Sequence, residues 1–499
     1  MDPLENEPNS PIGNVPVEIF LTIFLSLDVK CLKNLALTCS WFRDIITENV
    51  LVTRKMKLKL AKDFWQSHQE LPHFGRRYET IEIYDVENSH SMLVDLSVRF
   101  GNCLRILTIE KSTLDEFTLF TILSSCECLE ELWMSEVEIR RNLEEIREII
   151  LTKLRSVTIR YTSWRVFRYL VGAQISSLEI DSYVDEGRGT RHHLVQMLSK
   201  QNQLTTLALY GTACRTLFRN SDVNWRSRLT SFHIKYYFGK NSNNVDENIV
   251  QFLLLNSQTL TNVEISLPNS RRVAACTVLN LGNVTSLTLQ INGLQRYEDF
   301  YVQLANEVPN RKLKHLNLSA HSSHSRFIKS ILKRYPTVTD LELRIVENTN
   351  VVQNMLPFLS DRFPHVEQLF VPETSNVVLT FPALKKLHLS YFKDVNNLVK
   401  FIGKNKSIEI VIVDFVHVQQ MSSIDKLIYD TRIPHLSLAG CSQSLQKIID
   451  LVQSKQPEQM QTLELRLLAH ESHEAFKIHF PCDLNDLKVK FLRFFGADL

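Results

Sequence analysis

The stretch Leu313-Lys314-His315-Leu316-Asn317-Leu318 carries the pattern that decides the fold. It reads apolar-x-x-apolar-x-apolar, and its last four positions alternate between apolar and polar side chains. Successive side chains of a β-strand point to opposite faces, so Leu316 and Leu318 share the face opposite to Asn317. The stretch therefore predicts a short strand with one buried face and one exposed face.

The same pattern returns along the chain at a nearly constant spacing. Seventeen copies can be identified by their second apolar position, and their mean spacing is about 25 residues, within the range of leucine-rich repeats. These positions are Ile81, Leu107, Leu132, Val157, Leu178, Leu207, Phe232, Val263, Leu287, Leu316, Leu341, Leu369, Leu387, Val411, Leu436, Leu463 and Leu487. Because such repeats bury their apolar faces against their neighbours, we expect an α/β solenoid rather than several globular domains.

Segments with a helical pattern follow most of the predicted strands, which indicates a horseshoe with parallel strands inside and helices outside. Leucine-rich repeats usually place Asn or Cys three residues past the last apolar strand position. Asn292 and Cys441 satisfy this rule, whereas Val137 and Val346 do not. We therefore expect an irregular horseshoe in which this polar ladder is largely missing.

Composition argues against several classes of function. Glycine contributes only 13 of the 499 residues, although tight primed hairpins and phosphate-cradling loops both need it. The formal net charge of +2 is too balanced to indicate a nucleic-acid partner. No apolar run is long enough to cross a bilayer, so we expect no membrane association.

The nine cysteines are odd in number, and none of their spacings matches a zinc site. We expect reduced, mostly buried thiols in an intracellular protein of the cytoplasm, the nucleus or both. The sequence has no G-x-S-x-G, Walker or H-E-x-x-H motif. We therefore expect no catalytic residues, no cofactor and no metal.

Residues 15–48 differ from the repeats that follow them. Pro16 is placed to start a helix, and Ile19, Ile23 and Leu27 then recur at helical spacing. Asp28 can cap a second helix, and a third short helix is predicted around Phe42. Three helices in so short a segment cannot bury this apolar surface among themselves, so a partner surface is expected. The alternative is an N-terminal cap for the solenoid.

This segment resembles an F-box. The family pattern begins Leu-Pro-x-Glu-(Ile/Leu) and ends near Val-Cys-x-x-(Trp/Phe)-Arg. The matching segments here are Val15-Pro16-x-Glu18-Ile19 and Thr38-Cys39-x-x-Phe42-Arg43, so Val15 replaces the usual leucine and Thr38 the usual valine. An F-box followed by leucine-rich repeats resembles the substrate-receptor subunits of SCF ubiquitin ligases.

The resemblance implies that the F-box binds a Skp-type adaptor, which in turn joins a cullin scaffold. It also implies that other subunits carry out ubiquitin transfer, so this chain is expected to be a non-catalytic receptor. The residues expected to bind the adaptor are Val15, Pro16, Ile19, Ile23, Phe24, Leu27, Leu32, Leu35, Cys39 and Phe42.

Four segments are predicted from these patterns. They are a disordered tail over residues 1–14, the F-box over 15–48, a connector and capping repeat over 49–76, and the leucine-rich repeats over 77–499. In the connector, residues 54–60 alternate between basic and apolar side chains. Leu58 lies 23 residues before Ile81, which predicts an additional, degenerate repeat with a solvated edge strand.

Side chains between the apolar strand positions should project onto the inner face of the sheet. In the early repeats this face is acidic, and its aromatic side chains are of the kind that anchor interfaces. The candidate target-binding residues are Tyr84, Trp133, Glu179, Asp181, Tyr210 and Phe370. We expect a basic segment of an unknown target protein to bind near Trp133, Glu179 and Asp181. The alternative is that these aromatic side chains pack on neighbouring strands.

Two other functions remain open. The chain can be a stand-alone leucine-rich repeat scaffold or inhibitor whose N-terminal helices only cap the array. It can also be a ligand-sensing receptor similar to plant hormone F-box proteins. That function requires a basic polyphosphate pocket, and the predicted inner face has no such cluster of basic residues.

Overall fold

The computed structural model describes residues 15–53, 56–68, 78–87, 90–140, 149–182, 188–219, 228–235, 243–268, 277–292, 310–321, 325–346, 349–371, 379–391, 394–416, 424–455, 457–467 and 476–480. The chain divides into two compact units. Unit 1 comprises Met1–Leu229, and unit 2 comprises Thr230–Leu499.

Unit 1 begins with short helices. Helix α1 (Val17–Ser26) starts directly after Pro16, and α2 (Val29–Thr38) is capped by Asp28, whose carboxylate accepts a hydrogen bond from the Cys31 N–H at 2.7 Å. Helix α3 (Ser40–Glu48) follows, and the short α4 (Val50–Thr53) extends the group. The three predicted helices and the Asp28 cap are confirmed, whereas α4 was not predicted.

A parallel sheet follows these helices in unit 1. Its strands pair in the order β1, β2, β3, β5, β7, β8 and β9, and the predicted second apolar positions lie directly opposite one another. Leu58 pairs with Ile81, so β1 lies where the predicted additional repeat places its strand. The strands are β1 (Lys57–Leu60), β2 (Thr80–Tyr84), β3 (Ile106–Glu110), β5 (Glu131–Ser135), β7 (Ser156–Arg160), β8 (Ser177–Ser182) and β9 (Thr206–Gly211).

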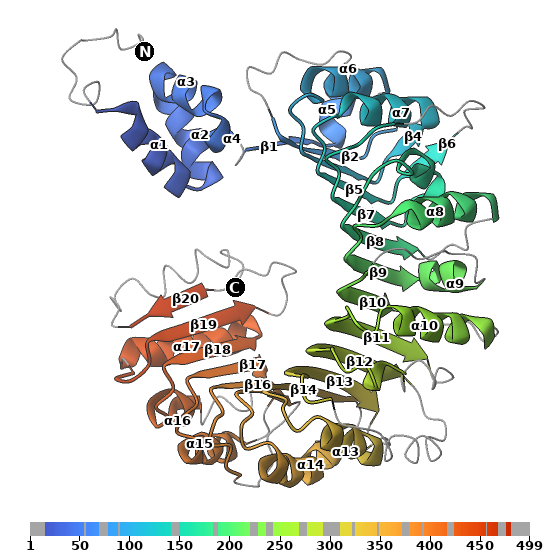
Figure 1. Cartoon of the computed structure of the whole chain (residues 1–499). Helices are drawn as coiled ribbons and strands as arrows, with labels where there is room; N and C mark the ends of the chain where they lie inside the picture. The colour runs from blue at the N-terminus through green and yellow to red at the C-terminus, as the bar shows by residue number, and fades with distance from the viewer. Residues whose placement is uncertain are drawn as a thin grey trace. The chain divides into compact units, whose positions relative to one another are not determined.

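Helices cover one side of these strands in unit 1 (Figure 1). The apolar strand positions and the apolar helix faces form the core between them, for example Leu107 of β3, Leu96 of α6 and Ile122 of α7. The helical segments are α5 (Lys62–Ser67), α6 (His90–Phe100), α7 (Glu116–Ser125), the 3₁₀ helix η1 (Trp164–Tyr169), α8 (Arg188–Lys200) and α9 (Thr212–Phe218).

The turns after the early strands share one conformation. Asp85, Lys111, Glu136 and Tyr161 each have a positive φ, which non-glycine residues rarely adopt. Each backbone N–H donates to a carbonyl of the next strand, as Lys111 does to Ser135 at 2.9 Å. Two of these turns lead into short strands, β4 (Thr113–Asp115) and β6 (Glu138–Arg140), which form a small second sheet.

Hydroxyl groups supply part of the ladder that was expected to be missing. The Ser112 hydroxyl accepts a hydrogen bond from the Val86 N–H at 3.1 Å and donates to the Glu110 carbonyl at 2.8 Å. Thr162 bonds the Val137 N–H in the same way, at 3.1 Å. Valine and a hydroxyl residue therefore alternate from repeat to repeat, and each hydroxyl satisfies the valine N–H of the preceding turn.

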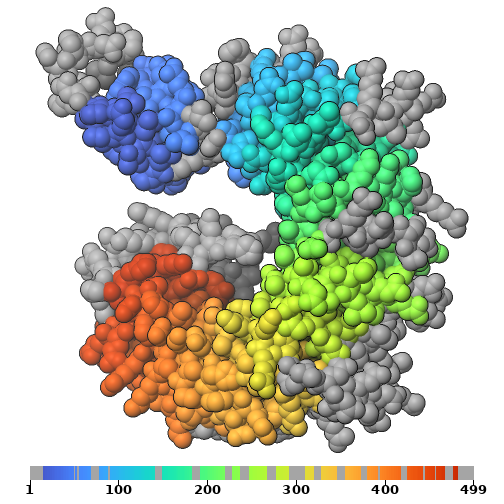
Figure 2. Space-filling model, viewed as in Figure 1, coloured from blue at the N-terminus to red at the C-terminus, as the bar shows by residue number. Residues whose placement is uncertain are grey.

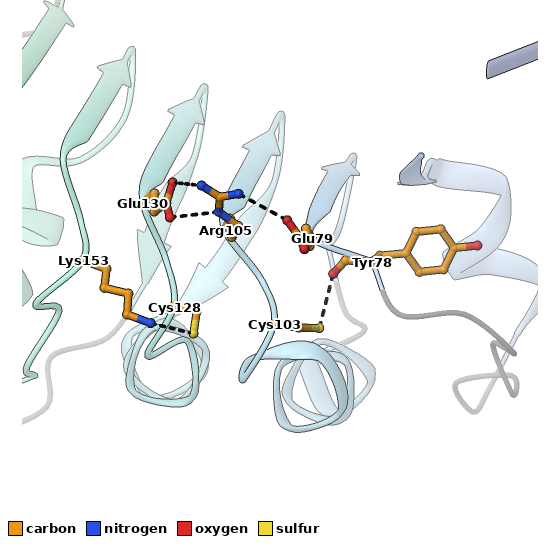
Figure 3. A network of polar contacts seen from close by, with 7 residues as sticks. All are labelled: Tyr78, Glu79, Cys103, Arg105, Cys128, Glu130 and Lys153. Carbon is orange, nitrogen blue, oxygen red and sulfur yellow. Dashed lines mark hydrogen bonds and ion pairs between the residues drawn. The ribbon is translucent and has the colours of Figure 1, made fainter. Parts of the chain in front are cut away.

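At the other end of the strands, where each strand begins, charged side chains connect one strand to the next (Figure 3). Arg105 precedes β3 and donates to both carboxylate oxygens of Glu130, at 2.8 and 2.6 Å. Its remaining nitrogen lies 3.5 Å from Glu79, which precedes β2. The alternation of charge across three successive repeats therefore joins β2, β3 and β5 at their starts.

Unit 2 continues the parallel arrangement in chain order. The predicted positions from Phe232 to Leu463 again lie opposite one another, so this part of the predicted register is confirmed. The strands are β10 (Ser231–Lys235), β11 (Asn262–Pro268), β12 (Ser286–Asn292), β13 (His315–His321), β14 (Asp340–Val346), β15 (Gln368–Val371), β16 (Lys386–Tyr391), β17 (Ile410–Val416), β18 (His435–Gly440) and β19 (Thr462–Leu467).

Helices again cover the core side of the unit 2 strands. They are α10 (Asn243–Leu255), α13 (Ser325–Arg334), α14 (Thr349–Arg362), α15 (Val395–Lys404), α16 (Ile424–Tyr429) and α17 (Ser442–Ser454). Side-chain amides form hydrogen bonds that connect neighbouring repeats. The Asn405 amide donates to the Leu379 carbonyl of the preceding repeat at 2.9 Å and to the Phe401 carbonyl of its own repeat at 2.7 Å.

The last strand that the structure describes departs from the parallel arrangement. Strand β20 (Phe476–His479) runs antiparallel to β19 and pairs Ile478 with Leu463. The repeat series places its next parallel strand, around Leu487, beside β19, and in the described residues β20 occupies that edge. The short connection from β19 to β20 suits an antiparallel pair, since a parallel pair needs a longer crossover. Leu487 and the predicted tail 1–14 lie outside the described residues.

Candidate functional site

The N-terminal helices have a small core of their own. Phe24 packs edge-to-face on Phe42, with ring centroids 5.7 Å apart, and Phe20 packs in the same manner on Trp41 at 5.0 Å. The buried residues of this core are Phe24, Leu32, Ala36, Ile46, Val52 and Met56. Figure 2 shows these helices in dark blue as one compact group.

The residues predicted to bind an adaptor fall into two groups. Phe24 and Leu32 are buried in the core of the helices, so they support the surface rather than form it. Leu27, Leu35 and Phe42 are half-buried and pack against this core. Val15 and Cys39 are also half-buried. Pro16, Ile19 and Ile23 are exposed and can contact a partner directly. The inclusion of Phe24 and Leu32 as contact residues is therefore corrected by their burial.

Further apolar side chains are exposed on these helices. Ile19 is 50% exposed and Leu37 is 85% exposed among the described residues. Several exposed apolar side chains on so small a domain make these helices a candidate interaction surface. The group comprises Val17, Ile19, Ile23, Leu25, Leu37, Trp41 and Leu51. The residues of this group that sequence reasoning missed are Val17, Leu25, Leu37, Trp41 and Leu51. Leu37 directly follows the core position Ala36 on its helix and so had to point elsewhere.

The exposed sheet face of unit 1 is less acidic than predicted. Strand β1 adds Lys57 and Lys59 to this face, and both lie before the early repeats on which the expected acidic character rested. Lys57 Nζ lies 2.7 Å from a carboxylate oxygen of Glu82, and Lys59 Nζ lies 4.6 Å from the centre of the Tyr84 ring. Burial and the neighbouring Glu82 raise the pKa of Tyr84 to about 12.

Trp133 and Glu179 are both engaged by Arg160. The Arg160 guanidinium lies 4.6 Å from the centre of the Trp133 ring and 2.6 Å from a Glu179 oxygen. Asp181 accepts a hydrogen bond from the Tyr161 hydroxyl at 2.8 Å, and burial raises the pKa of its carboxyl. Tyr210 lies opposite Asp181 on β9. The structure therefore places these residues together, and the binding of a basic target there stays a prediction.

The exposed sheet face of unit 2 carries a trough with a volume of about 450 Å³. It crosses β12 to β16 and contains Phe370, which is one of the predicted target-binding residues. The Phe370 ring packs edge-to-face on His388, with centroids 4.5 Å apart, and the Arg344 guanidinium lies 5.2 Å from its centre. The trough was not predicted, because its outline depends on side-chain sizes compared across five strands.

Histidine and carboxylate side chains pair across neighbouring strands of this face. His233 lies 3.0 Å from Glu264, and His388 lies 2.7 Å from Asp414. The hydrogen bond from His233, together with Lys235, lowers the pKa of Glu264 to about 2. These carboxylates therefore already have partners within the chain.

No group of His, Cys, Asp and Glu side chains among the described residues is arranged to hold a metal ion. Within the same residues, no helix combines the length and the apolar character needed to cross a membrane.

Comparison with known proteins identifies the N-terminal helices. A family profile described as F-box-like matches residues 12–57, which include α1 to α4 and the start of β1. The chain thus contains an F-box-like domain, and domains of this kind generally bind Skp-type adaptors. A search of curated proteins with the whole chain found no match.

Proposed function

We propose that this protein is the substrate-recognition subunit of an SCF-type ubiquitin ligase. The F-box-like domain docks on a Skp-type adaptor that joins a cullin scaffold, and the repeats bind a target protein. The chain itself is non-catalytic and acts in the cytoplasm, the nucleus or both. The observation that carries the proposal is the F-box-like match over residues 12–57 together with the exposed apolar group on the same helices.

The repeats support the second half of the proposal. Parallel strand–helix units at a spacing of about 25 residues have the organisation of leucine-rich repeats. Such an array presents side chains from successive strands about 4.8 Å apart, which lets several repeats contact one partner. We infer that the target lies on the exposed sheet faces, where Trp133, Tyr210 and Phe370 are half-buried.

The scaffold alternative predicts a different role for the N-terminal helices. A helical cap needs to bury its apolar side chains against the first repeat. Instead, Ile19, Ile23 and Leu37 are exposed among the described residues. This exposure favours a partner outside the chain over a purely capping role.

Substitutions in the docking surface should remove the adaptor. We expect Ile19→Asp with Ile23→Asp to reduce adaptor recovery about tenfold, because buried charge opposes an apolar interface. Val15→Ala with Pro16→Ala should reduce recovery less, since it loosens the start of α1. The measurement is co-purification of a Skp-type adaptor with each full-length variant.

The matched control for the docking substitutions is Val98→Asp. Val98 is 66% exposed on α6, outside the F-box-like domain. Val98→Asp places one aspartate at an exposed apolar position, whereas the docking variant carries two, and it should leave adaptor recovery unchanged. Equal adaptor recovery from the wild-type chain and the Ile19→Asp, Ile23→Asp variant would show that this surface does not dock an adaptor.

A further inference from the structure

The trough in unit 2 is bounded by two rows of side chains in register. The first row runs across the strands as Ser286, His315, Asp340, Gln368 and Lys386. The second row runs as Thr288, Asn317, Glu342, Phe370 and His388. Four leucines lie between the rows, namely Leu287, Leu316, Leu341 and Leu369, and their side chains are buried on the other face.

The floor of the trough is therefore main chain whose hydrogen-bonding groups lie within the parallel sheet. Recognition falls to the two rows, because such a floor has few donors or acceptors to offer. Five strands spaced about 4.8 Å apart give a trough about 19 Å long. An extended peptide rises about 3.3 Å per residue, so the trough matches a segment of about six residues.

Among the described residues, the carboxylates of the two rows have charged or hydrogen-bonding partners, whereas the ammonium group of Lys386 does not. Asp340 is paired with His315, and Glu342 accepts a hydrogen bond from the Asn317 amide at 2.7 Å and also pairs with Arg344. The Lys386 ammonium, in contrast, has no ion pair or side-chain hydrogen bond with any residue that the structure describes. At its β16 end the trough therefore favours a ligand group that carries a negative charge.

Phe370 lies diagonally across the trough from Lys386. It belongs to the second row on β15, whereas Lys386 belongs to the first row on β16. Consecutive side chains of an extended peptide project to opposite sides, so adjacent peptide residues can face Lys386 and Phe370 at the same time. An acidic side chain suits the first position, and an aromatic side chain suits the second, where it packs on the Phe370 ring.

We propose that this trough binds an extended segment of the target protein that contains an acidic residue next to an aromatic residue. The acidic side chain pairs with Lys386, and the aromatic side chain stacks against Phe370. This inference rests on the proposed function because it places part of target recognition in unit 2. It adds a second recognition element, of opposite charge, to the basic segment expected in unit 1.

The test uses bead-bound hexapeptide libraries with random flanks and a fixed central pair. The pairs are Glu-Phe, Lys-Phe and Glu-Ser, and the probe is the fluorescently labelled full-length chain. We expect Glu-Phe beads to retain about fivefold more wild-type chain than either other library, as one charge pair and one aromatic contact each contribute. Equal retention on the three libraries, or no retention on any of them, would overturn the proposal.

A charge reversal separates this site from any other basic surface. Lys386→Glu should shift the preference from Glu-Phe to Lys-Phe beads, whereas the wild-type preference should persist in Lys404→Glu. Lys404 is exposed in the last turn of α15, in the repeat that begins with β16, and lies outside the trough. An unchanged preference in Lys386→Glu would contradict the assignment.

The outcome for the trough can be distinguished from the outcome for the adaptor. Binding to the beads does not require the F-box-like domain to dock on an adaptor. Glu-Phe beads should therefore retain the Ile19→Asp, Ile23→Asp variant as well as they retain the wild-type chain. Conversely, the adaptor should co-purify with the Lys386→Glu variant as it does with the wild-type chain. In the wild-type chain, an intact bead preference without adaptor binding would overturn only the proposed ligase function, and adaptor binding without a bead preference would overturn only the trough.

Discussion

We expect replacement of Glu116 by alanine to lower the free energy of unfolding of unit 1 by about 3–5 kcal/mol. Glu116 begins α7, and its carboxylate lies 2.9 Å from Arg168 Nη1 of η1. The side chains are only 1% and 10% exposed, respectively. The substitution removes the carboxylate but leaves the Arg168 charge buried, which is costly in a medium of low polarity.

Hydrogen exchange of the α7 and η1 amides in the full-length chain measures this decrease in the free energy of unfolding. A local measurement is needed because a repeat array need not unfold in one step. The pair Glu138–Arg140 provides the control, because it has the same 2.9 Å separation but is solvent-exposed. Glu138→Ala should change the exchange little. Replacing both Glu116 and Arg168 by methionine should cost less than Glu116→Ala alone. A similar exchange pattern in Glu116→Ala and Glu138→Ala would contradict the account.

The second large effect is expected in the core of unit 2. Leu316→Ala and Leu387→Ala should each lower the free energy of unfolding by about 2–5 kcal/mol, because each leaves a cavity between sheet and helices. Both leucines are buried at paired positions of the repeat, with Leu316 between Leu287 and Leu341 on the neighbouring strands.

Hydrogen exchange of the β13 and β16 amides measures these two losses. The control is Lys314→Ala, an exposed position directly before β13. Its exchange should match that of the wild-type chain. Losses below about 0.5 kcal/mol for both leucines would mean that these positions do not carry the core.

The register of the sheet could be predicted because it depends on a local rule. A one-residue shift would move every apolar side chain of a strand to the exposed face, so the alternation around Leu316 fixes which face is buried. Repetition then aligns neighbouring strands, as the pairing of Leu316 with Leu287 and Leu341 confirms. The Asp28 cap was predictable for the same reason, since it depends on residues three positions apart.

Other features depend on contacts between repeats, which periodicity does not reveal. The bond from Val86 to Ser112 becomes apparent only when turns 26 residues apart are set side by side. The engagement of Trp133 by Arg160 and the trough beside Phe370 likewise depend on residues of different strands. The reversed direction of β20 depends on the length of one connection rather than on its apolar pattern. On the N-terminal helices, composition predicted an apolar surface, but only packing separates the buried Phe24 from the exposed Ile23.

Affinity purification from cells tests the central claim most directly. The full-length chain is compared with a chain that lacks residues 1–56, which removes the F-box-like helices and stops before β1. We predict that a Skp-type adaptor and a cullin co-purify only with the full-length chain, whereas the target protein is recovered with both chains. Recovery of adaptor and cullin in equal amounts with both chains, or their absence from both, would contradict the assignment of this protein as a ubiquitin-ligase receptor.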